Sequence, residues 1–232
     1  MSIALPSPTG LLAGIDMGSN SFRLEIGHLR EGRYRRHAYL KETVRLGAGL
    51  DNEGMLTDEA AERGLACLRQ FARNLGGFHP AQVRAVATQT LREARNRDAF
   101  LHRAQAALGF PIEVISGREE ARLIYAGVAH LQPSSQPRLV VDIGGRSTEL
   151  ILGEKRQPIE AESFRVGSVS LSMRYFPDGQ FSSEGFRAAQ VAAGADVGGA
   201  ENGIPHAADQ PDIIGQVPFG GPEPGNDRTQ VR

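Results

Sequence analysis

Short hydrophobic runs separated by polar turns open the chain, and they predict strands rather than helices. Residues 11–17 form a nearly continuous apolar run typical of a buried strand, and residues 22–29 predict its hairpin partner. Residues 33–46 alternate loosely between apolar and polar positions, which indicates a third and more exposed strand. The first part of the chain therefore predicts three successive strands, of which the first two form a hairpin.

After this strand-rich part, apolar residues recur at the spacing of a helix. Thr57 is a typical N-cap with two acidic residues behind it, and its helix is predicted to end at Gly76 with an apolar face formed by Leu65, Leu68, Ala72 and Leu75. The segments that follow are a strand at 83–88, a helix from Thr90, a helix at 98–108 stopped by Gly109, a strand at 110–115 and a helix from Ser116 to about Leu131. This order predicts an α/β protein with a mixed sheet and helices on its faces.

The first hairpin is repeated later in the chain. Residues 15–27 match residues 141–153 position for position, with Asp16 matching Asp142, Gly18 matching Gly144, Ser21 matching Ser147, Leu24 matching Leu150 and Gly27 matching Gly153. A repeat at this separation predicts two similar domains rather than a solenoid. The Pro/Ser-rich residues 132–137 are the predicted boundary, so the expected domains are 1–131 and 138–190.

Each copy of the hairpin places a carboxylate at the end of a buried strand, followed by glycines and hydroxyl groups. Successive N–H groups in such a turn form an anion-binding concavity, and glycine lets the backbone approach a ligand. One copy alone is more often an ordinary hairpin turn. Because the flanking strands are repeated too, we interpret the turns as facing phosphate-binding loops, with Ser19, Asn20, Ser21 and Arg23 as candidate contacts in the first.

The starts of two helices carry further candidates. Thr90 and Glu93 match a capping box, which gives Glu93 a structural role but leaves Arg92 unexplained, because a cation in the first turn opposes the helix dipole. Arg92 is therefore predicted either to face an anion or to be solvated. Ser116 and Glu119 form a second capping box in the same way.

Glu120 follows this second box and remains free. A carboxylate near the positive end of a helix stays ionised, and beside a phosphate site it can accept a proton from an attacking water. The alternative is that Glu120 pairs with Arg92 or Arg118 on the surface.

Three carboxylates are candidate magnesium ligands: Asp16, Asp142 and Glu149. Magnesium prefers one or two carboxylates together with phosphate oxygens and waters. The alternative for the aspartates is an Asx-turn that only holds its own loop. The two hairpins differ at one matching place, where the first has Arg23 and the second has Glu149.

Composition narrows the classes of function. The 26 Lys and Arg residues against 27 Asp and Glu give a net charge of −1, which offers no electrostatic support for a nucleic-acid partner. The single cysteine, Cys67, excludes an internal disulfide and suits a reducing compartment. We see no signal peptide and no apolar run long enough for a membrane span, so the expected location is cytoplasmic. A homodimer is left open.

Four motifs together resemble the exopolyphosphatase / guanosine pentaphosphate phosphatase family: residues 16–23, 87–96, 115–125 and 142–149. The resemblance covers roughly residues 11–190 and implies an actin-like fold of two ribonuclease-H-like domains around a cleft. It implies hydrolysis of a terminal phosphoanhydride with magnesium. It assigns the catalytic base to Glu120, phosphate binding to Arg23, Arg92, Gly144, Gly145, Ser147 and Thr148, and the neighbourhood of the metal to Asp142 and Glu149. Arg146 departs from the expected third glycine, and it either adds a phosphate contact or crowds the loop.

Two classes of function follow. The first is an exopolyphosphatase, or else a guanosine pentaphosphate phosphatase; inorganic polyphosphate is favoured because nothing in the sequence resembles a guanine pocket. The second is an ATP-dependent kinase or nucleotide-binding protein of the actin-like superfamily, which would need an adenosine pocket that the sequence does not show.

The end of the chain has a different character. Residues 166–176 predict a strand and a turn, and a helix is predicted to begin at Ser182. Residues 191–232 are rich in glycine and proline and show no clear period apart from Ile213 and Ile214, which predicts disorder. The expectation is therefore an unfinished second domain with an open sheet edge, as in a truncated or frame-shifted product of weak activity.

Overall fold

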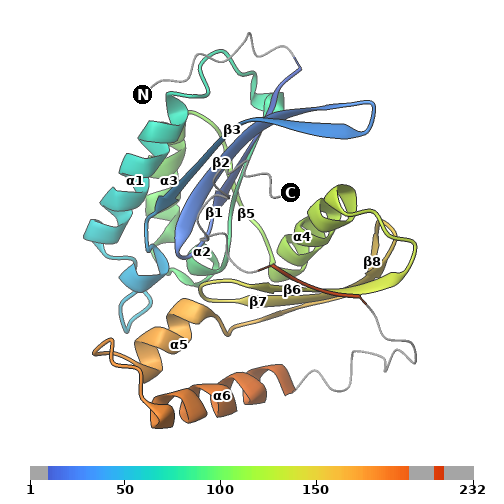
Figure 1. The fold of residues 1–232 in the computed structure, drawn as a ribbon. Coiled ribbons are helices and arrows are strands. Elements are labelled where there is room, and N and C mark those ends of the chain that lie inside the picture. The colour runs from blue at the N-terminus through green and yellow to red at the C-terminus, as the bar shows by residue number, and fades with distance from the viewer. Residues whose placement is uncertain (1–9, 199–211, 217–232) are drawn as a thin grey trace, which may run out of the picture.

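The chain forms two open β-sheets with helices packed on them (Figure 1). A computed structural model describes residues 10–198, and the backbone alone for residues 212–216. In the described part no helix is long and apolar enough to cross a membrane. The mixed α/β class expected from the sequence is confirmed.

The first sheet has the strand order β3-β2-β1-β4-β5. Its strands are β1 (Leu12–Met17), β2 (Ser21–Arg30), β3 (Arg33–Thr43), β4 (Val83–Ala87) and β5 (Ile112–Val114). The predicted hairpin of β1 and β2 is confirmed, β3 pairs antiparallel with β2, and β4 and β5 run parallel to β1. The carboxyl ends of β1, β4 and β5 therefore meet at one edge, where ligands bind in open α/β sheets.

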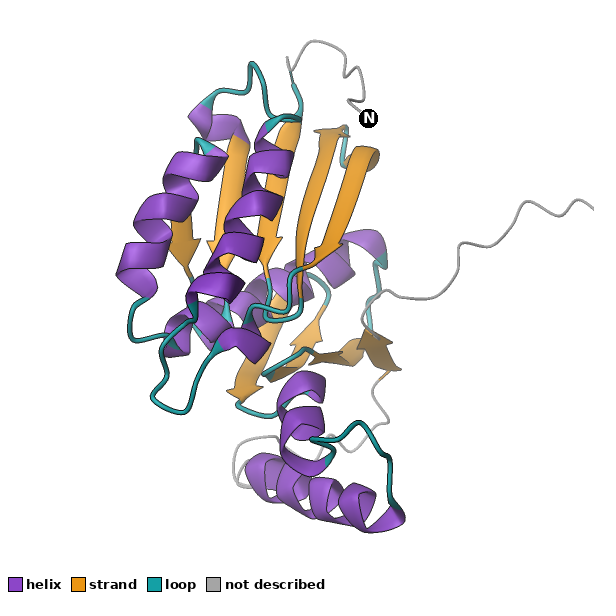
Figure 2. Ribbon diagram, turned by 90° about the vertical axis from the view of Figure 1, so that its left-hand side faces the viewer, coloured by secondary structure: helices purple, strands orange, loops and turns teal. Residues whose placement is uncertain are grey.

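Two helices cover one face of this sheet, and Figure 2 shows them side by side in front of it. They are α1 (Asp58–Ala72) and α3 (Arg97–Leu108), and the short helix α2 (Gln89–Glu93) and two 3₁₀ turns (Gly47–Gly49 and Pro80–Gln82) lie in the connections. Thr57 caps α1 by accepting a hydrogen bond from the amide of Ala60, as predicted. Phe22, Leu24 and Ile26 of β2 are fully buried in the core that these helices close. Helix α1 ends at Ala72 rather than at Gly76.

The second sheet has the order β8-β7-β6-β9. Its strands are β6 (Pro137–Ile143), β7 (Thr148–Glu154), β8 (Gln157–Phe164) and β9 (Asp212–Gln216), and helix α4 (Gly117–Leu131) packs on it. The predicted second hairpin is confirmed, and its register repeats the first: Asp16 pairs with Arg23, and Asp142 pairs with Glu149. Strand β8 was not predicted.

The last described elements differ from the sequence prediction. Residues 168–175 form helix α5 (Ser168–Tyr175) rather than a strand and turn, because the Ser170 hydroxyl bonds both backbone groups of Gly167 and begins a helical turn. Helix α6 (Ser183–Gly198) begins as predicted but runs into the segment expected to be disordered. Its alanine-rich sequence favours a helix.

The second sheet is open, as predicted, but β6 is not its edge strand. Strand β9 pairs with β6 in parallel, and its pairing includes Ile213 and Ile214. A strand edge supplies hydrogen-bond partners that sequence periodicity alone does not reveal. The remainder of the predicted tail, residues 199–211 and 217–232, lies outside the described residues.

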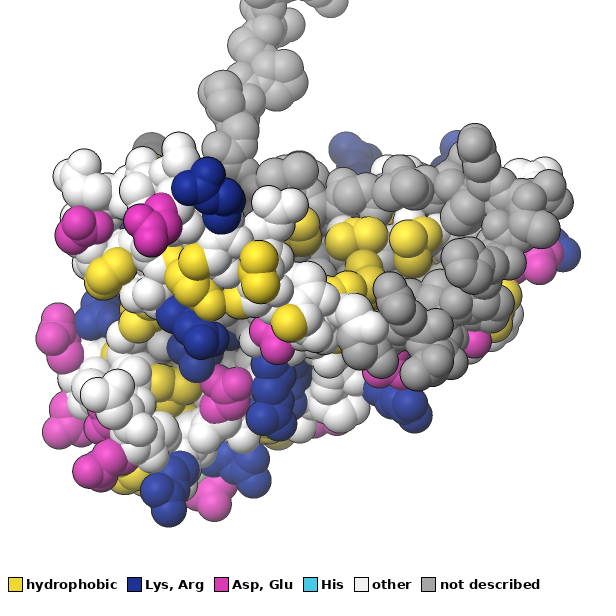
Figure 3. Space-filling model, turned by 90° about the horizontal axis from the view of Figure 1, so that it is seen from below, with side chains coloured by type: hydrophobic (Ala, Val, Ile, Leu, Met, Phe, Trp, Pro, Cys, Tyr) yellow, Lys and Arg dark blue, Asp and Glu magenta, His cyan; other side chains and the backbone are white. Residues whose placement is uncertain are grey.

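Helices α5 and α6 form a pair at the lower end of the molecule. Phe176, Phe181 and Phe186 contact one another with ring centroids 5.0–5.9 Å apart, and Phe181, Phe186 and Val191 are more than half exposed. Figure 3 shows apolar side chains between charged ones on this lower face. The pair therefore presents apolar surface without a cover among the described residues.

Candidate active site

The turns of the two hairpins lie against each other. A Cβ atom at Gly145 would lie 3.3 Å from Cβ of Ser19 and 3.5 Å from Cβ of Asn20, so the two backbones are in close contact. Gly18 and Gly144 close their turns in the same way, because a Cβ at either position would meet the carbonyl oxygen three residues later at 3.0 and 2.9 Å. The repeat in the sequence is thus a repeat in shape.

Hydroxyl groups in these turns already have partners inside the protein. Thr90 Oγ1 donates to Ser19 Oγ at 2.8 Å, Thr148 Oγ1 donates to the carbonyl of Val166 at 2.7 Å, and Ser147 bonds Glu149. The backbone amides of Asn20 and Gly145, by contrast, have no hydrogen-bond partner among the described residues. The hydroxyls therefore shape the turns, and the amides remain for an anion.

Charged side chains gather beside the turns. Arg23 Nη1 lies 2.7 Å from Asp16 Oδ2, and the charge of Arg23 also acts on Asp142 in the second hairpin. Burial raises the pKa of Asp16 and of Asp142, and Arg23 opposes both shifts. The carboxylate of Asp142, unlike its backbone, has no hydrogen-bond or ion-pair partner among the described residues. The structure therefore brings Asp16, Arg23 and Asp142 together.

Glu149 lies deeper, with only 1% of its surface exposed. Ser163 Oγ donates to Glu149 Oε1 at 2.8 Å, and burial raises the pKa of this carboxyl. Ser163 comes from β8, so the sequence offered no signal for this contact.

Glu120 is held by Arg92. Arg92 Nη1 lies 2.8 Å from Glu120 Oε2, and the two side chains are only 18% and 16% exposed. Burial, followed by the charge of Glu149, raises the pKa of Glu120 to about 7, although Arg92 acts to lower it. Of the alternatives left open, Arg92 therefore faces an anion, and Glu120 pairs with Arg92 in a partly buried place rather than on the surface.

Neither predicted capping box forms in full. Helix α2 begins at Gln89, so Thr90 lies inside it and is not its N-cap. Ser116 does cap α4 by accepting from the amide of Glu119, but the Glu119 side chain bonds Arg84 and Arg122 on the surface. A nearby guanidinium competes better for a carboxylate than a neutral backbone amide does.

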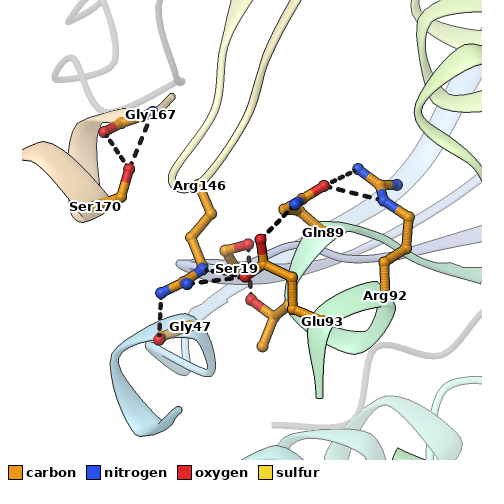
Figure 4. Close-up of polar contacts among 9 residues, drawn as sticks. Ser19, Gly47, Gln89, Arg92, Glu93, Arg146, Gly167 and Ser170 are labelled. Carbon is orange, nitrogen blue, oxygen red and sulfur yellow. Dashed lines mark hydrogen bonds and ion pairs between the residues drawn. The ribbon is translucent and has the colours of Figure 1, made fainter. Parts of the chain in front are cut away.

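Glu93 instead bonds the second hairpin (Figure 4). Arg146 donates from Nε and Nη2 to Glu93 Oε2 at 3.1 and 2.8 Å, and from Nη1 to the carbonyl of Gly47 at 3.1 Å. Glu93 Oε1 accepts from Gln89, and Gln89 Oε1 accepts from Arg92. Gln89 lies in the motif of residues 87–96 and Gly47 in a predicted loop, but the sequence assigned neither residue a role in this network.

The carboxylates of the site are the groups that could bind a magnesium ion. No group of three or more His, Cys, Asp and Glu side chains in the described ranges is arranged to hold a metal ion. Four carboxylates, at Asp16, Glu120, Asp142 and Glu149, nevertheless share this region with two arginines, and the pKa of each carboxyl is raised. This excess of partly buried carboxylates over arginines fits a cation that binds one or two carboxylates and completes its shell with phosphate and water oxygens.

Comparison with known proteins identifies the family. The model of the Ppx/GppA phosphatase family matches residues 30–210. This chain belongs to the Ppx/GppA phosphatase family. The resemblance drawn from the four motifs is therefore confirmed, and members of the family are phosphatases.

Solved structures agree with this assignment. An exopolyphosphatase-like protein is 31% identical over 88% of this chain and 65% of its own, with a TM-score of 0.80. An exopolyphosphatase from Cytophaga hutchinsonii is 28% identical over 88% and 66%, with a TM-score of 0.76. The PPX-GPPA enzyme of Aquifex aeolicus is 28% identical over 88% and 67%, with a TM-score of 0.69. The chain thus spans about two thirds of the length of these relatives.

A more distant likeness concerns the fold alone. The ethanolamine utilization protein EutJ from Carboxydothermus hydrogenoformans is 17% identical over 93% of this chain and 79% of its own, with a TM-score of 0.52. The predicted actin-like fold is confirmed by this likeness together with the family relatives.

Proposed function

We propose that the protein hydrolyses the terminal phosphoanhydride bond of inorganic polyphosphate. The observation that carries the proposal is the partly buried carboxylate of Glu120, which Arg92 holds beside the two facing turns and whose pKa is raised to about 7. A carboxylate with a pKa near neutrality is a more effective proton acceptor than an ordinary surface glutamate.

In the proposed reaction, Glu120 takes a proton from a water molecule while the water oxygen attacks the terminal phosphorus. The bond from that phosphorus to the bridging oxygen breaks in line, which releases orthophosphate and a chain shortened by one unit. Arg23 and the amides of the turns bind the phosphate oxygens, and Arg92 reaches both Glu120 and the charge that develops on the transferred group.

Asp142 is the main proposed magnesium ligand, because its carboxylate has no other partner among the described residues. Asp16 lies beside it and is the second proposed ligand. The buried Glu149 is hydrogen-bonded by Ser163 and is therefore assigned to the region around the metal rather than to its shell. The ion would neutralise charge on the phosphates when bound.

A hollow of about 370 Å³ opens beside Arg92. It is lined by Arg92, Arg97, Asp98, Leu101, Val114, Ile115 and Ser116. Two arginines offer contacts to phosphates, whereas no aromatic ring in this lining can stack a guanine base.

The deciding experiment compares Glu120→Gln with its neighbour Glu119→Gln. Loss of the proton acceptor should lower phosphate release from polyphosphate by about 10²–10⁴-fold, with polyphosphate binding retained. Glu119 pairs with Arg84 and Arg122 on the surface, so its variant should keep nearly full activity. The reverse pattern would move the base to Glu119.

Phosphate release from each substrate and a separate ATP-binding measurement distinguish the rival functions. Faster phosphate release from guanosine pentaphosphate than from long-chain polyphosphate would reassign the substrate. Tight ATP binding without polyphosphate binding would instead support a kinase or nucleotide-binding protein of the same fold.

A further inference from the structure

Arg146 joins the two hairpin regions of the molecule. It lies in the turn between β6 and β7, yet its guanidinium binds Glu93 of α2 and the carbonyl of Gly47, both of which belong to the first sheet and its connections. Its side chain is only 21% exposed and that of Glu93 only 26%. A glycine at position 146, as the family resemblance leads one to expect, would make none of these contacts.

The stem of Arg146 is packed rather than loose. A Cβ atom added at Gly47 would lie 2.6 Å from Cδ of Arg146 and 3.0 Å from Oγ1 of Thr90. Gly47 therefore provides the space through which the side chain reaches Glu93. This packing restricts the rotamers of Arg146, so its hydrogen bonds cost less side-chain entropy than those of an exposed arginine.

The contact continues by side chains to Arg92 (Figure 4), which bonds the proposed base Glu120. Glu93 uses Oε2 for Arg146 and Oε1 for Gln89 Nε2, which lies 2.6 Å away. The Gln89 amide therefore turns its oxygen toward Arg92, whose Nε and Nη2 donate to it at 3.0 and 2.6 Å. Arg92 Nη1 is left to bond Glu120 and the carbonyl of Ile115.

The charges in this network determine which carboxylate Arg92 binds. Arg146 neutralises Glu93, and the Gln89 amide separates Glu93 from Arg92, so the charge of Arg92 remains available to Glu120. Without Arg146, the partly buried charge of Glu93 has no cation beside it. Glu93 then competes with Glu120 for the guanidinium of Arg92, and the bond between Gln89 and Arg92 is disturbed. Removing one partner of such a pair disturbs its neighbours more than removing both.

We infer that Arg146 is a positioning residue, which fixes the two hairpin turns against each other and, through Glu93, Gln89 and Arg92, orients the carboxylate of Glu120. The catalytic part of this inference rests on the proposed function. The contact between the hairpins does not, because it concerns only how the two sheets are joined.

The test is a double-mutant cycle with Arg146→Gly and Glu93→Gln. Each single variant should lower kcat for polyphosphate by about tenfold while KM changes little, because misorientation of a catalytic group affects the chemical step. The double variant should be no worse than either single one, and Arg146→Lys should recover part of the rate. Arg165→Gly removes an exposed arginine from a loop and serves as the control.

Other results would overturn the inference. Additive losses in the double variant would show that Arg146 acts independently of Glu93. A raised KM with unchanged kcat would make Arg146 a simple phosphate contact.

A readout that needs no activity tests the joint between the hairpins. Hydrogen exchange at the amides of Gly47 and Gly144, which bond the carbonyls of Ser19 and Ser147, should accelerate in Arg146→Gly but not in Arg165→Gly. If the wild-type chain hydrolyses none of the proposed substrates, the proposed function fails, and exchange still decides whether Arg146 holds the turns. Unchanged exchange would refute that role.

Discussion

Arg92 Nη1 donates to Glu120 Oε2 at 2.8 Å, but the pKa of Glu120 is still raised to about 7, because burial and the charge of Glu149 outweigh the arginine. A proton acceptor with this pKa predicts that kcat/KM rises with pH through an acid limb near 7. Replacing Arg92 by Gln removes the cation that lowers this pKa, so the limb should move to higher pH. The measurement is the pH profile of kcat/KM for both proteins.

Arg84→Gln is the matched control for this shift. Arg84 contacts Glu119 and Glu113 on the surface rather than Glu120, so its loss should leave the limb in place. An acid limb that stays fixed in the Arg92 variant would show that another group controls the profile.

The same pKa makes a prediction about stability. The pKa of Glu120 rises from 4.5 to about 7 in the folded chain, so between these values the folded protein retains a proton that the unfolded chain has lost. The contribution of this group to the free energy of unfolding is then present at low pH and lost as pH rises through 7. The glutamine of Glu120→Gln cannot ionise. The melting temperature of this variant, relative to that of the wild type, should therefore increase between pH 5 and pH 8. A difference independent of pH would contradict the raised pKa.

Features that depend on local sequence were predictable. The two hairpins, the cap of α1 by Thr57 and the repeat that pairs Asp16 with Arg23 and Asp142 with Glu149 all follow from runs, turns and short spacings. The turn glycines were recognisable because both copies need close approach of backbone at the same place.

Features that depend on distant partners were not predictable. Glu93 matches a capping box, but Arg146, 53 positions later, offers it a full positive charge. Strand β9 lies in a segment with little periodicity, and pairing with β6 supplies its hydrogen bonds. In both cases tertiary contacts outweigh the local pattern.

Asp142 predicts how activity should depend on magnesium. If this unpaired carboxylate helps to bind the magnesium ion, Asp142→Asn should raise the magnesium concentration needed for half-maximal activity. Saturating magnesium should then restore part of the rate. Asp178→Asn is a suitable control, because Asp178 is exposed in the turn after α5 and bonds only the amide of Gln180 among the described residues. Equal magnesium requirements in the two variants would remove Asp142 from the metal site.

The repeat also predicts a steric requirement at its last matching glycine. A Cβ at Gly153 would lie 2.3 Å from Cζ of Tyr125, a fully buried ring on α4, the helix that carries Glu120 near its start. Gly153→Ala should therefore force Tyr125 and α4 away from β7 and cost about 1–3 kcal/mol of stability. Gly127→Ala lies on the same helix with nothing within 4 Å, so it should instead stabilise the protein by about 0.5–1 kcal/mol. Urea denaturation of both variants measures the two effects, and a Gly153 variant as stable as the Gly127 variant would show that α4 does not pack this closely against the second hairpin.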